Sequence, residues 1–282
     1  IPAESILCGN GAADLIFRLA WAAKPRTALV TAPTFAEYAA ALESAGCAVR
    51  RHFLQAEVDF AVTDSILSSI TPEVDMVFLC QPNNPTGQLT PLPLVERILR
   101  RCEACGALLV VDECFLDFLP DCDALTAKAL LDSKNLLILK AFTKLYGMAG
   151  VRLGYCLCAN TALLEAMQAA GQPWAVSSLA QAAGLAALDE TAYVAQVRAL
   201  IAQQRPRLTA GLRALGLRVL DGRANYLLFQ GPETLGDALR QWGVVLRSCS
   251  NYPGLDGSWY RTAVRTGPEN DELLKTLAEV LA

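Results

Sequence analysis

A lysine and an arginine near the middle of the chain have the types and spacing of a reactive amine beside an anion site. Lys144 follows the apolar run at 135–140, and Arg152 lies eight residues further on. A lysine in apolar, glycine-rich surroundings can act as a nucleophile toward carbonyl groups. An arginine guanidinium binds phosphate through two parallel hydrogen bonds. The pair therefore predicts a nucleophilic lysine next to a phosphate group.

A carboxylate ends another apolar run of the chain. Asp112 closes the apolar part of the segment VVDECFLDF at 110–118. An unpaired carboxylate at the end of a buried strand is costly unless it meets a cation or a hydrogen-bond donor. We therefore expect Asp112 to have a partner.

Two glycine-containing segments could bind a ligand. Residues 9–14 read GNGAAD and are expected to open a helix, whose first N–H groups can hold a phosphate. Asp14 stands where a dinucleotide-binding motif has its third glycine. Residues 80–87 read CQPNNPTG, and an ordinary turn explains this composition as well as a ligand site does.

The elements that position these residues follow from four short apolar runs that alternate with helical patterns. The runs are TALVTA at 27–32, DMVFLC at 75–80, ALLVVD at 107–112 and NLLILK at 135–140. This alternation is typical of an α/β domain with a parallel sheet covered on both faces. Ligands gather at the carboxyl ends of such strands, so we expect the polar residues that follow the runs to meet there.

The pattern changes near Thr191. A long helical stretch interrupted at Pro206 leads into short strands and a last helix near the C-terminus. We predict two domains, a large one over 1–189 and a smaller α+β domain over 190–282.

Composition narrows the class of partner. The net charge is -4, without a block of like charges, so a nucleic-acid binder is not indicated and a small-molecule substrate is expected. Residues 166–188 carry no charge, but they are rich in Ala, Gln, Gly and Ser, so we predict a buried helix and no membrane span. No signal peptide is visible, and a cytoplasmic protein is expected.

The chain has ten cysteines, and Cys102 and Cys105 form a CxxC pair. A zinc site would need a second suitable pair or histidines, whereas the only histidine is His52. We expect reduced, mostly buried thiols and no metal.

The order and spacing of GNGAAD, PTF, NNPTG, DECF, the Lys144 segment and Arg152 resemble the class I and II aminotransferase family of fold-type I pyridoxal-phosphate (PLP) enzymes. The resemblance covers nearly the whole chain and is strongest to the branch of histidinol-phosphate aminotransferases and threonine-phosphate decarboxylases. It implies a three-layer αβα large domain of the PLP-dependent transferase type with a mostly parallel sheet, a smaller α+β C-terminal domain, PLP as cofactor and a homodimer.

The resemblance also implies roles for residues around the cofactor ring. Lys144 is expected to hold PLP as a Schiff base, and Asp112 to pair with the pyridine nitrogen, which keeps the ring an electron sink. Asn84 is expected to donate to the phenolic oxygen of the ring, and Phe35 to stack on its face.

Further residues match the family's phosphate and substrate positions. The backbone of Gly11 and Ala12, with Thr143 and Arg152, is expected to hold the cofactor phosphate. On the substrate side, the resemblance gives Arg261 for the carboxylate and Asn225 as a second contact.

The chain departs from the family pattern in two places and begins abruptly. Phe115 stands where many aminotransferases have a tyrosine that donates to the ring oxygen, and Ala141 stands where the family usually has Ser or Thr on the phosphate. We therefore expect a higher pH midpoint for the imine and weaker cofactor binding. Relatives have several dozen more residues before GNGAAD, including an arm over the substrate.

Three functions stay open. The segments CSNYPGLDG at 249–257 and YRTAVRTGPEN at 260–270 resemble the decarboxylase side, which implies a threonine-phosphate decarboxylase-like enzyme of the cobalamin pathway acting on a small phosphorylated amino acid. The alternative is an aminotransferase of the histidinol-phosphate type. A catalytically silent homologue is the third, against which the intact Lys144, Asp112 and Arg152 argue.

Overall fold

A seven-stranded sheet forms the larger half of the molecule, in a computed structural model that describes residues 1–282. Its strands are arranged in the order β1-β7-β6-β5-β4-β2-β3. They are β1 (Ile6–Gly9), β2 (Thr27–Ala32), β3 (Ala48–Phe53), β4 (Met76–Cys80), β5 (Leu108–Asp112), β6 (Leu136–Ala141) and β7 (Gly154–Cys158). The pairs from β3 to β6 are parallel, and β7 runs antiparallel to both of its neighbours. The predicted, mostly parallel sheet is confirmed.

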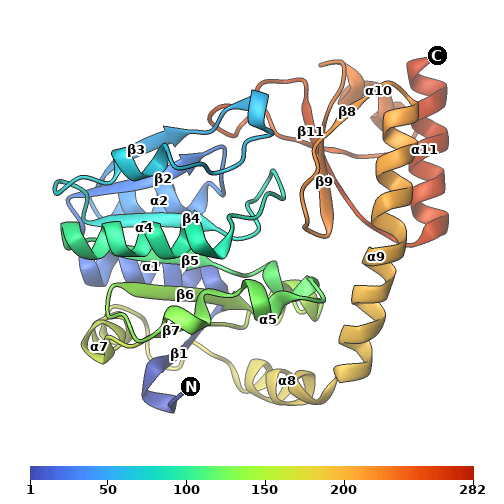
Figure 1. Ribbon diagram of the computed structural model, residues 1–282. Helices are drawn as coiled ribbons and strands as arrows, with labels where there is room; N and C mark the ends of the chain where they lie inside the picture. Colours follow the sequence, from blue (N-terminus) through green and yellow to red (C-terminus); the bar gives the residue numbers. More distant parts are fainter.

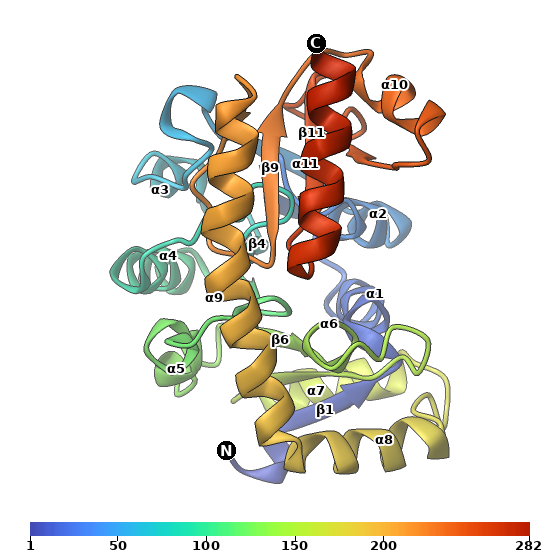
Figure 2. The same cartoon turned by 90° about the vertical axis from the view of Figure 1, so that its right-hand side faces the viewer.

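Helices cover both faces of this sheet, so the large half has three layers (Figure 1). The helices are α1 (Gly11–Ala23), α2 (Glu37–Ser44), α3 (Ile66–Ser69), α4 (Leu92–Cys105), α5 (Cys122–Leu125), α6 (Phe142–Leu145) and α7 (Thr161–Ala169). Figure 2 shows α1 and α2 on one side and α3, α4 and α5 on the other. Each layer follows from the apolar strands, because side chains that alternate along a strand supply a core on both faces.

The two faces of the large sheet have separate cores. One core of 20 buried residues joins α1, α2 and α7 to one face, and another of 26 joins α4 to the opposite face. Within β5, for example, Val110 belongs to the first core and Leu109 and Val111 belong to the second. The central strands β2, β4, β5 and β6 are largely apolar because both of their faces are buried, as their continuous apolar runs predicted. The edge strand β3 is mostly exposed.

The smaller half of the molecule is built around a four-stranded antiparallel sheet in the order β10-β11-β9-β8. Its strands are β8 (Arg218–Val219), β9 (Tyr226–Gln230), β10 (Arg247–Ser248) and β11 (Trp259–Ala263). Its helices are α9 (Thr191–Ala214), α10 (Leu235–Gln241) and α11 (Gly267–Leu281). These helices share a core of 12 buried residues with one face of the sheet.

The other face of the small sheet packs against the large half. Leu228 and Trp259 point to this side and belong to the same core as α4. The alternation along β9 and β11 thus puts one face into the small core and the other at the junction of the two halves. We keep the domain boundary after residue 189 as a proposal; it falls between α8 (Ser178–Asp189) and α9.

Two details differ from the expectations. Residues 166–188 do not form one buried helix, because Gly171 and Pro173 separate α7 from α8 and α8 carries an exposed apolar face. The helix expected to break at Pro206 runs through it. No helix has both the length and the apolar character needed to cross a membrane.

Candidate active site

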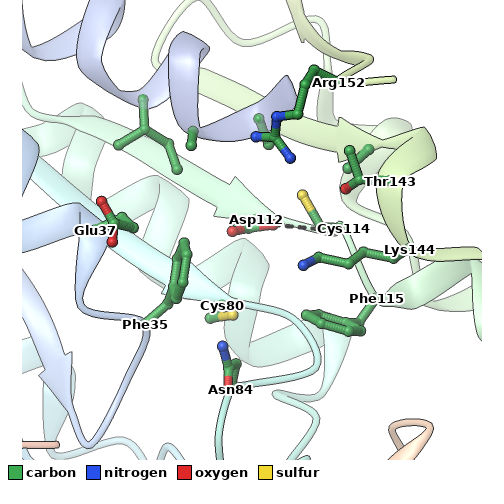
Figure 3. A pocket seen from close by; sticks show the side chains of 14 residues that line it. Phe35, Glu37, Cys80, Asn84, Asp112, Cys114, Phe115, Thr143, Lys144 and Arg152 are labelled. Atoms are coloured by element: carbon green, nitrogen blue, oxygen red, sulfur yellow. Dashed lines mark hydrogen bonds between the residues drawn. The ribbon is translucent and has the colours of Figure 1, made fainter. Parts of the chain in front are cut away.

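A cavity of about 280 Å³ lies at the carboxyl ends of the central strands, beside the start of α1 (Figure 3). It is lined by Ala12, Ala13, Ile16, Phe35, Glu37, Cys80, Asn84, Asp112, Cys114, Phe115, Ala141, Thr143, Lys144 and Arg152. Seven of the eight residues assigned to cofactor binding from the sequence line it, and the eighth, Gly11, contacts Arg152 beside it. The parallel strands bring these residues together because β4, β5 and β6 all end at this edge.

Lys144 lies on the short helix α6, directly after β6, and its amine points into the cavity. The side chain is exposed to the cavity and makes no hydrogen bond or ion pair. Its Nζ atom lies 5.2 Å from the centroid of the Phe115 ring, a cation–π distance. An amine that no carboxylate holds is available to react with a carbonyl group.

Lys140, which lies on β6 itself, is in the opposite situation. It is 1% exposed, and its Nζ lies 3.0 Å from Glu113 and 2.8 Å from Asp117. Burial alone would lower the pKa of Lys140, but the two carboxylates outweigh this effect and raise the pKa above its ordinary value. Lys140 therefore stays protonated and is a structural cation, whereas Lys144 is the reactive candidate.

Asp112 is buried at the end of β5 and has two donors. The Tyr38 hydroxyl donates to its Oδ2 at 2.6 Å, and the Cys114 amide donates to its Oδ1 at 2.9 Å. Burial raises the pKa of Tyr38 well above its ordinary value, so the phenol remains a donor. The expectation of a partner for Asp112 is met by neutral donors, which leaves its negative charge for a cation in the cavity.

The opposite end of the cavity is suited to an anion. No side chain caps α1, so the N–H groups of its first turn, including Ala12 and Ala13, face the cavity without a capping acceptor. Gly11 has φ +81°, and a Cβ there would lie 2.7 Å from Arg152 Nη2. Arg152 itself has φ 62°, a costly conformation for a large side chain. Together with the nearby Thr143 hydroxyl, these groups form an anion-binding end.

The loop after β4 presents Asn84. Its side-chain oxygen accepts hydrogen bonds from Arg261 and, at 3.4 Å, from the Tyr252 hydroxyl. Because both donors occupy the oxygen, the amide nitrogen is directed to the cavity, as Figure 3 shows. Asn84 can thus donate a hydrogen bond to a ligand.

A second cavity of about 420 Å³ lies against Lys144 and Phe115, between the two halves of the molecule. Its lining includes three arginines, Arg247, Arg261 and Arg265. Arg265 pairs with Glu269 at 2.7 Å, whereas Arg247 and Arg261 have no carboxylate partner. Asn225 also lines this cavity, and its buried Oδ1 has no hydrogen-bond donor. The second cavity is suited to a polar ligand with anionic groups.

Sequence reasoning missed the tyrosines of the site. Tyr38, Tyr226 and Tyr252 are buried and each donates to a residue of the cavity walls or to a neighbouring backbone carbonyl. The one usable signal was the position of Tyr38, three residues after Phe35 and in the first turn of α2. The two departures from the family pattern, Phe115 and Ala141, both line the first cavity.

Comparison with known proteins identifies one protein family that matches this chain. The model of the family described as aminotransferase class I and II matches residues 1–278. A curated threonine-phosphate decarboxylase of Salmonella typhimurium is 39% identical over all of this chain and 78% of its own length. A histidinol-phosphate aminotransferase of Desulfitobacterium hafniense is 36% identical over all of this chain and 79% of its own length.

Solved structures agree with the sequence relatives. The histidinol-phosphate aminotransferase from Clostridium acetobutylicum matches with a TM-score of 0.92 and 28% identity. The match covers 98% of this chain and 84% of the other. The fold predicted from the sequence is therefore confirmed by a solved relative.

Proposed function

Because this chain belongs to the class I and II aminotransferase family, whose members use PLP, we propose that it is a PLP-dependent decarboxylase of threonine phosphate or a closely similar amino acid. The single observation that carries the substrate class is the pair of arginines in the second cavity, Arg247 and Arg261, which have no carboxylate partner. Threonine phosphate has two anionic groups, and each arginine can take one of them.

The cavity fits PLP by the chemistry of its donors. The uncapped start of α1, Thr143 and Arg152 would hold the phosphate, and Gly11 leaves the space that Arg152 needs. At the other side, Asp112 would pair with the protonated pyridine nitrogen, and the Asn84 amide would donate to the ring oxygen. Phe35 would cover one ring face, and Lys144 would hold the carbonyl carbon.

When bound, PLP withdraws electrons from the α-carbon of an amino acid, so that one of the bonds to that carbon can break. The chain's residues decide which bond breaks. Asp112 would favour a protonated ring nitrogen, and the Lys144 amine would be placed to carry a proton to or from the α-carbon. Arg261 would fix the substrate carboxylate, and the orientation of that carboxylate would select the bond that breaks.

An aminotransferase of the histidinol-phosphate type is the second candidate. The 36% identity to the Desulfitobacterium enzyme and the TM-score of 0.92 to the Clostridium structure support it. Histidinol phosphate has one anionic group and no carboxylate, so it would leave one of the two arginines unpaired. The keto-acid acceptor of a transaminase would bring a carboxylate only in the other half-reaction, whereas threonine phosphate can engage both arginines at once. This difference favours the decarboxylase.

The deciding experiment follows two products in parallel. The purified protein is loaded with PLP and incubated with threonine phosphate or histidinol phosphate, with and without a keto-acid acceptor. Carbon dioxide release from threonine phosphate, without transfer of its amino group, supports the proposal. Amino transfer from histidinol phosphate without carbon dioxide release from threonine phosphate would replace it by the second candidate.

Arg261→Lys is expected to raise KM for threonine phosphate about tenfold or more, because a lysine ammonium cannot form the two parallel hydrogen bonds of a guanidinium. Because a lysine ammonium can still donate to Asn84 Oδ1, cofactor absorbance and affinity should stay near those of the wild type. The measurement is steady-state kinetics together with a PLP titration. An unchanged KM, or loss of PLP, would contradict the role and direct attention to Arg247 or Arg265.

A homodimer is part of the proposal, and the exposed apolar surface near α8 supports it. Trp174 is 94% exposed, and Leu179, Leu185 and Leu188 of α8 are 80%, 69% and 60% exposed. Several large apolar side chains exposed on one helix and the segment before it are typical of an interface. A second copy of the chain would cover them.

Leu185→Glu is expected to reduce the mass in solution from about twice 30.2 kDa to that of one chain, because a carboxylate would be buried in the interface. Light scattering during gel filtration measures this mass. Trp242→Glu is the matched control, since Trp242 is 59% exposed but lies at the C-terminal end of α10, away from α8. A wild-type mass of one chain would refute the dimer.

The compartment and pathway follow from the same proposal. All ten cysteines are free thiols, eight of them buried, which fits the reducing cytoplasm. A threonine-phosphate decarboxylase activity would place the enzyme in cobalamin biosynthesis.

A further inference from the structure

Tyr226 lies where the two halves of the molecule meet. It is the first residue of β9, is 4% exposed, and belongs to the sheet face that is turned toward the large half. Its hydroxyl contacts the backbone of Asn83, next to the cavity residue Asn84, and its ring contacts Arg261 and Phe115. A substitution that removes only the hydroxyl can therefore be distinguished from one that also removes the ring.

The hydroxyl of Tyr226 donates to the backbone oxygen of Asn83 at 2.9 Å, across 143 residues of sequence. This oxygen belongs to the peptide group between Asn83 and Asn84, so the bond fixes the plane from which the Asn84 side chain extends. Burial raises the pKa of Tyr226 well above its ordinary value, so the hydroxyl remains a donor at any physiological pH. The phenol thus holds the backbone of the Asn84 loop.

The ring of Tyr226 supports Arg261. The guanidinium carbon of Arg261 lies 5.0 Å from the ring centroid, a cation–π distance. The register explains the contact: Tyr226 pairs with Ala263 and Leu228 with Arg261, so Tyr226 and Arg261 are diagonal neighbours on the same face. The same ring meets Phe115 edge to face, with centroids 5.2 Å apart. Phe115 in turn borders Lys144.

We propose that Tyr226 is a positioning residue, whose ring orients Arg261 for the substrate carboxylate while its hydroxyl orients Asn84 for the cofactor ring oxygen. The two roles belong to different parts of the side chain, since the ring contacts Arg261 and the hydroxyl oxygen contacts the Asn83 backbone. The inference rests on the proposed roles of Arg261 and Asn84. It does not depend on whether the enzyme decarboxylates or transaminates.

Tyr226→Phe tests the hydroxyl alone. The variant keeps the ring, and the Asn83 oxygen keeps its second donor, the Gly87 amide at 2.6 Å, so no buried acceptor is left without a partner. A less firmly held Asn84 donates more weakly to the ring oxygen, which makes the imine nitrogen more basic. The pH midpoint of the imine absorbance should rise by about half a unit. KM for threonine phosphate should change less than about threefold.

Tyr226→Leu removes the ring as well. KM should then rise about tenfold, since Arg261 loses its support. Tyr260→Phe is the matched control: Tyr260 is 2% exposed on the neighbouring strand, and its hydroxyl donates to the carbonyls of Pro232 and Glu233 within the small half. This control removes a buried phenol of the same sheet and should lose thermal stability without a change in the midpoint.

The absorbance titration decides between the outcomes even where Tyr226→Leu fails to fold. A raised midpoint in Tyr226→Phe and an unchanged one in Tyr260→Phe support the inference. If the wild-type protein shows the imine band and the Tyr226→Phe variant has the same pH midpoint, this inference is overturned and the proposed function stays intact. A wild-type protein with no imine band would overturn the proposed function, and this inference with it.

Discussion

Lys144→Ala is expected to abolish the visible absorbance of the bound cofactor and to reduce turnover below about a thousandth of the wild-type rate. The reason is that the amine of Lys144 is the only lysine nitrogen that lines either cavity, and no carboxylate holds it. Without it, neither covalent attachment nor proton transfer at the α-carbon is available. Absorbance spectra of the PLP-treated protein and single-turnover assays measure the two effects.

The control for this variant is Lys134→Ala. Lys134 precedes β6 on the surface and makes no ion pair or hydrogen bond through its side chain. Its removal should leave both the absorbance and the rate unchanged. A Lys144→Ala protein that keeps the imine band would mean that another lysine carries the cofactor.

Asp112→Asn is expected to fold and to bind PLP but to lose at least about 100-fold in turnover. The side-chain oxygen of Asn can still accept the Cys114 amide, and Tyr38 can accept from the new amide, so the local hydrogen bonds survive. The amide cannot hold a proton on the pyridine nitrogen, and a well-placed electrostatic partner of this kind contributes about 3 kcal/mol to the transition state.

Thermal unfolding, a PLP titration and turnover separate these effects. Asp123→Asn provides the comparison, since Asp123 is exposed eleven residues further on and makes no ion pair. It should behave like the wild type in all three measurements. Near-native turnover of Asp112→Asn would show that Asp112 stabilises the fold and has no electrostatic role.

The main site could be predicted because parallel strands end at one edge. The runs that end at Cys80, Asp112 and Lys140 were visible as continuous apolar segments. Asp112 ends one of them, and Asn84 and Lys144 each lie four residues after another. Buried strands constrain their sequence on both faces, so their positions were accurate to about one residue. The residues after them were then brought together by topology alone.

The tyrosines of the site could not be predicted in the same way. Tyr38 meets Asp112 across 74 residues of sequence, Tyr226 meets Asn83 across 143, and Tyr252 meets Asn84 across 168. Nothing in the local pattern distinguishes a phenol that donates to a distant carbonyl from one that only fills a core. Such contacts depend on how the two halves pack.

The environment of α8 was also hidden from the sequence. An uncharged, Ala-rich segment has the same composition whether its own chain or a partner covers it. The prediction of burial was wrong because Leu179, Leu185 and Leu188 face outward, and only Ala180, Gly184 and Ala187 form the buried seam. Small residues along that seam allow close packing, and Gly184 lies directly against Leu153.

The central claim is that Lys144 carries PLP, and reduction followed by peptide mapping tests it most directly. The wild-type protein is loaded with PLP, treated with borohydride to fix the imine, digested and analysed by mass spectrometry. We predict one modified peptide, with the reduced cofactor on Lys144. Modification of Lys140 or of any other lysine, or of none, would contradict the account.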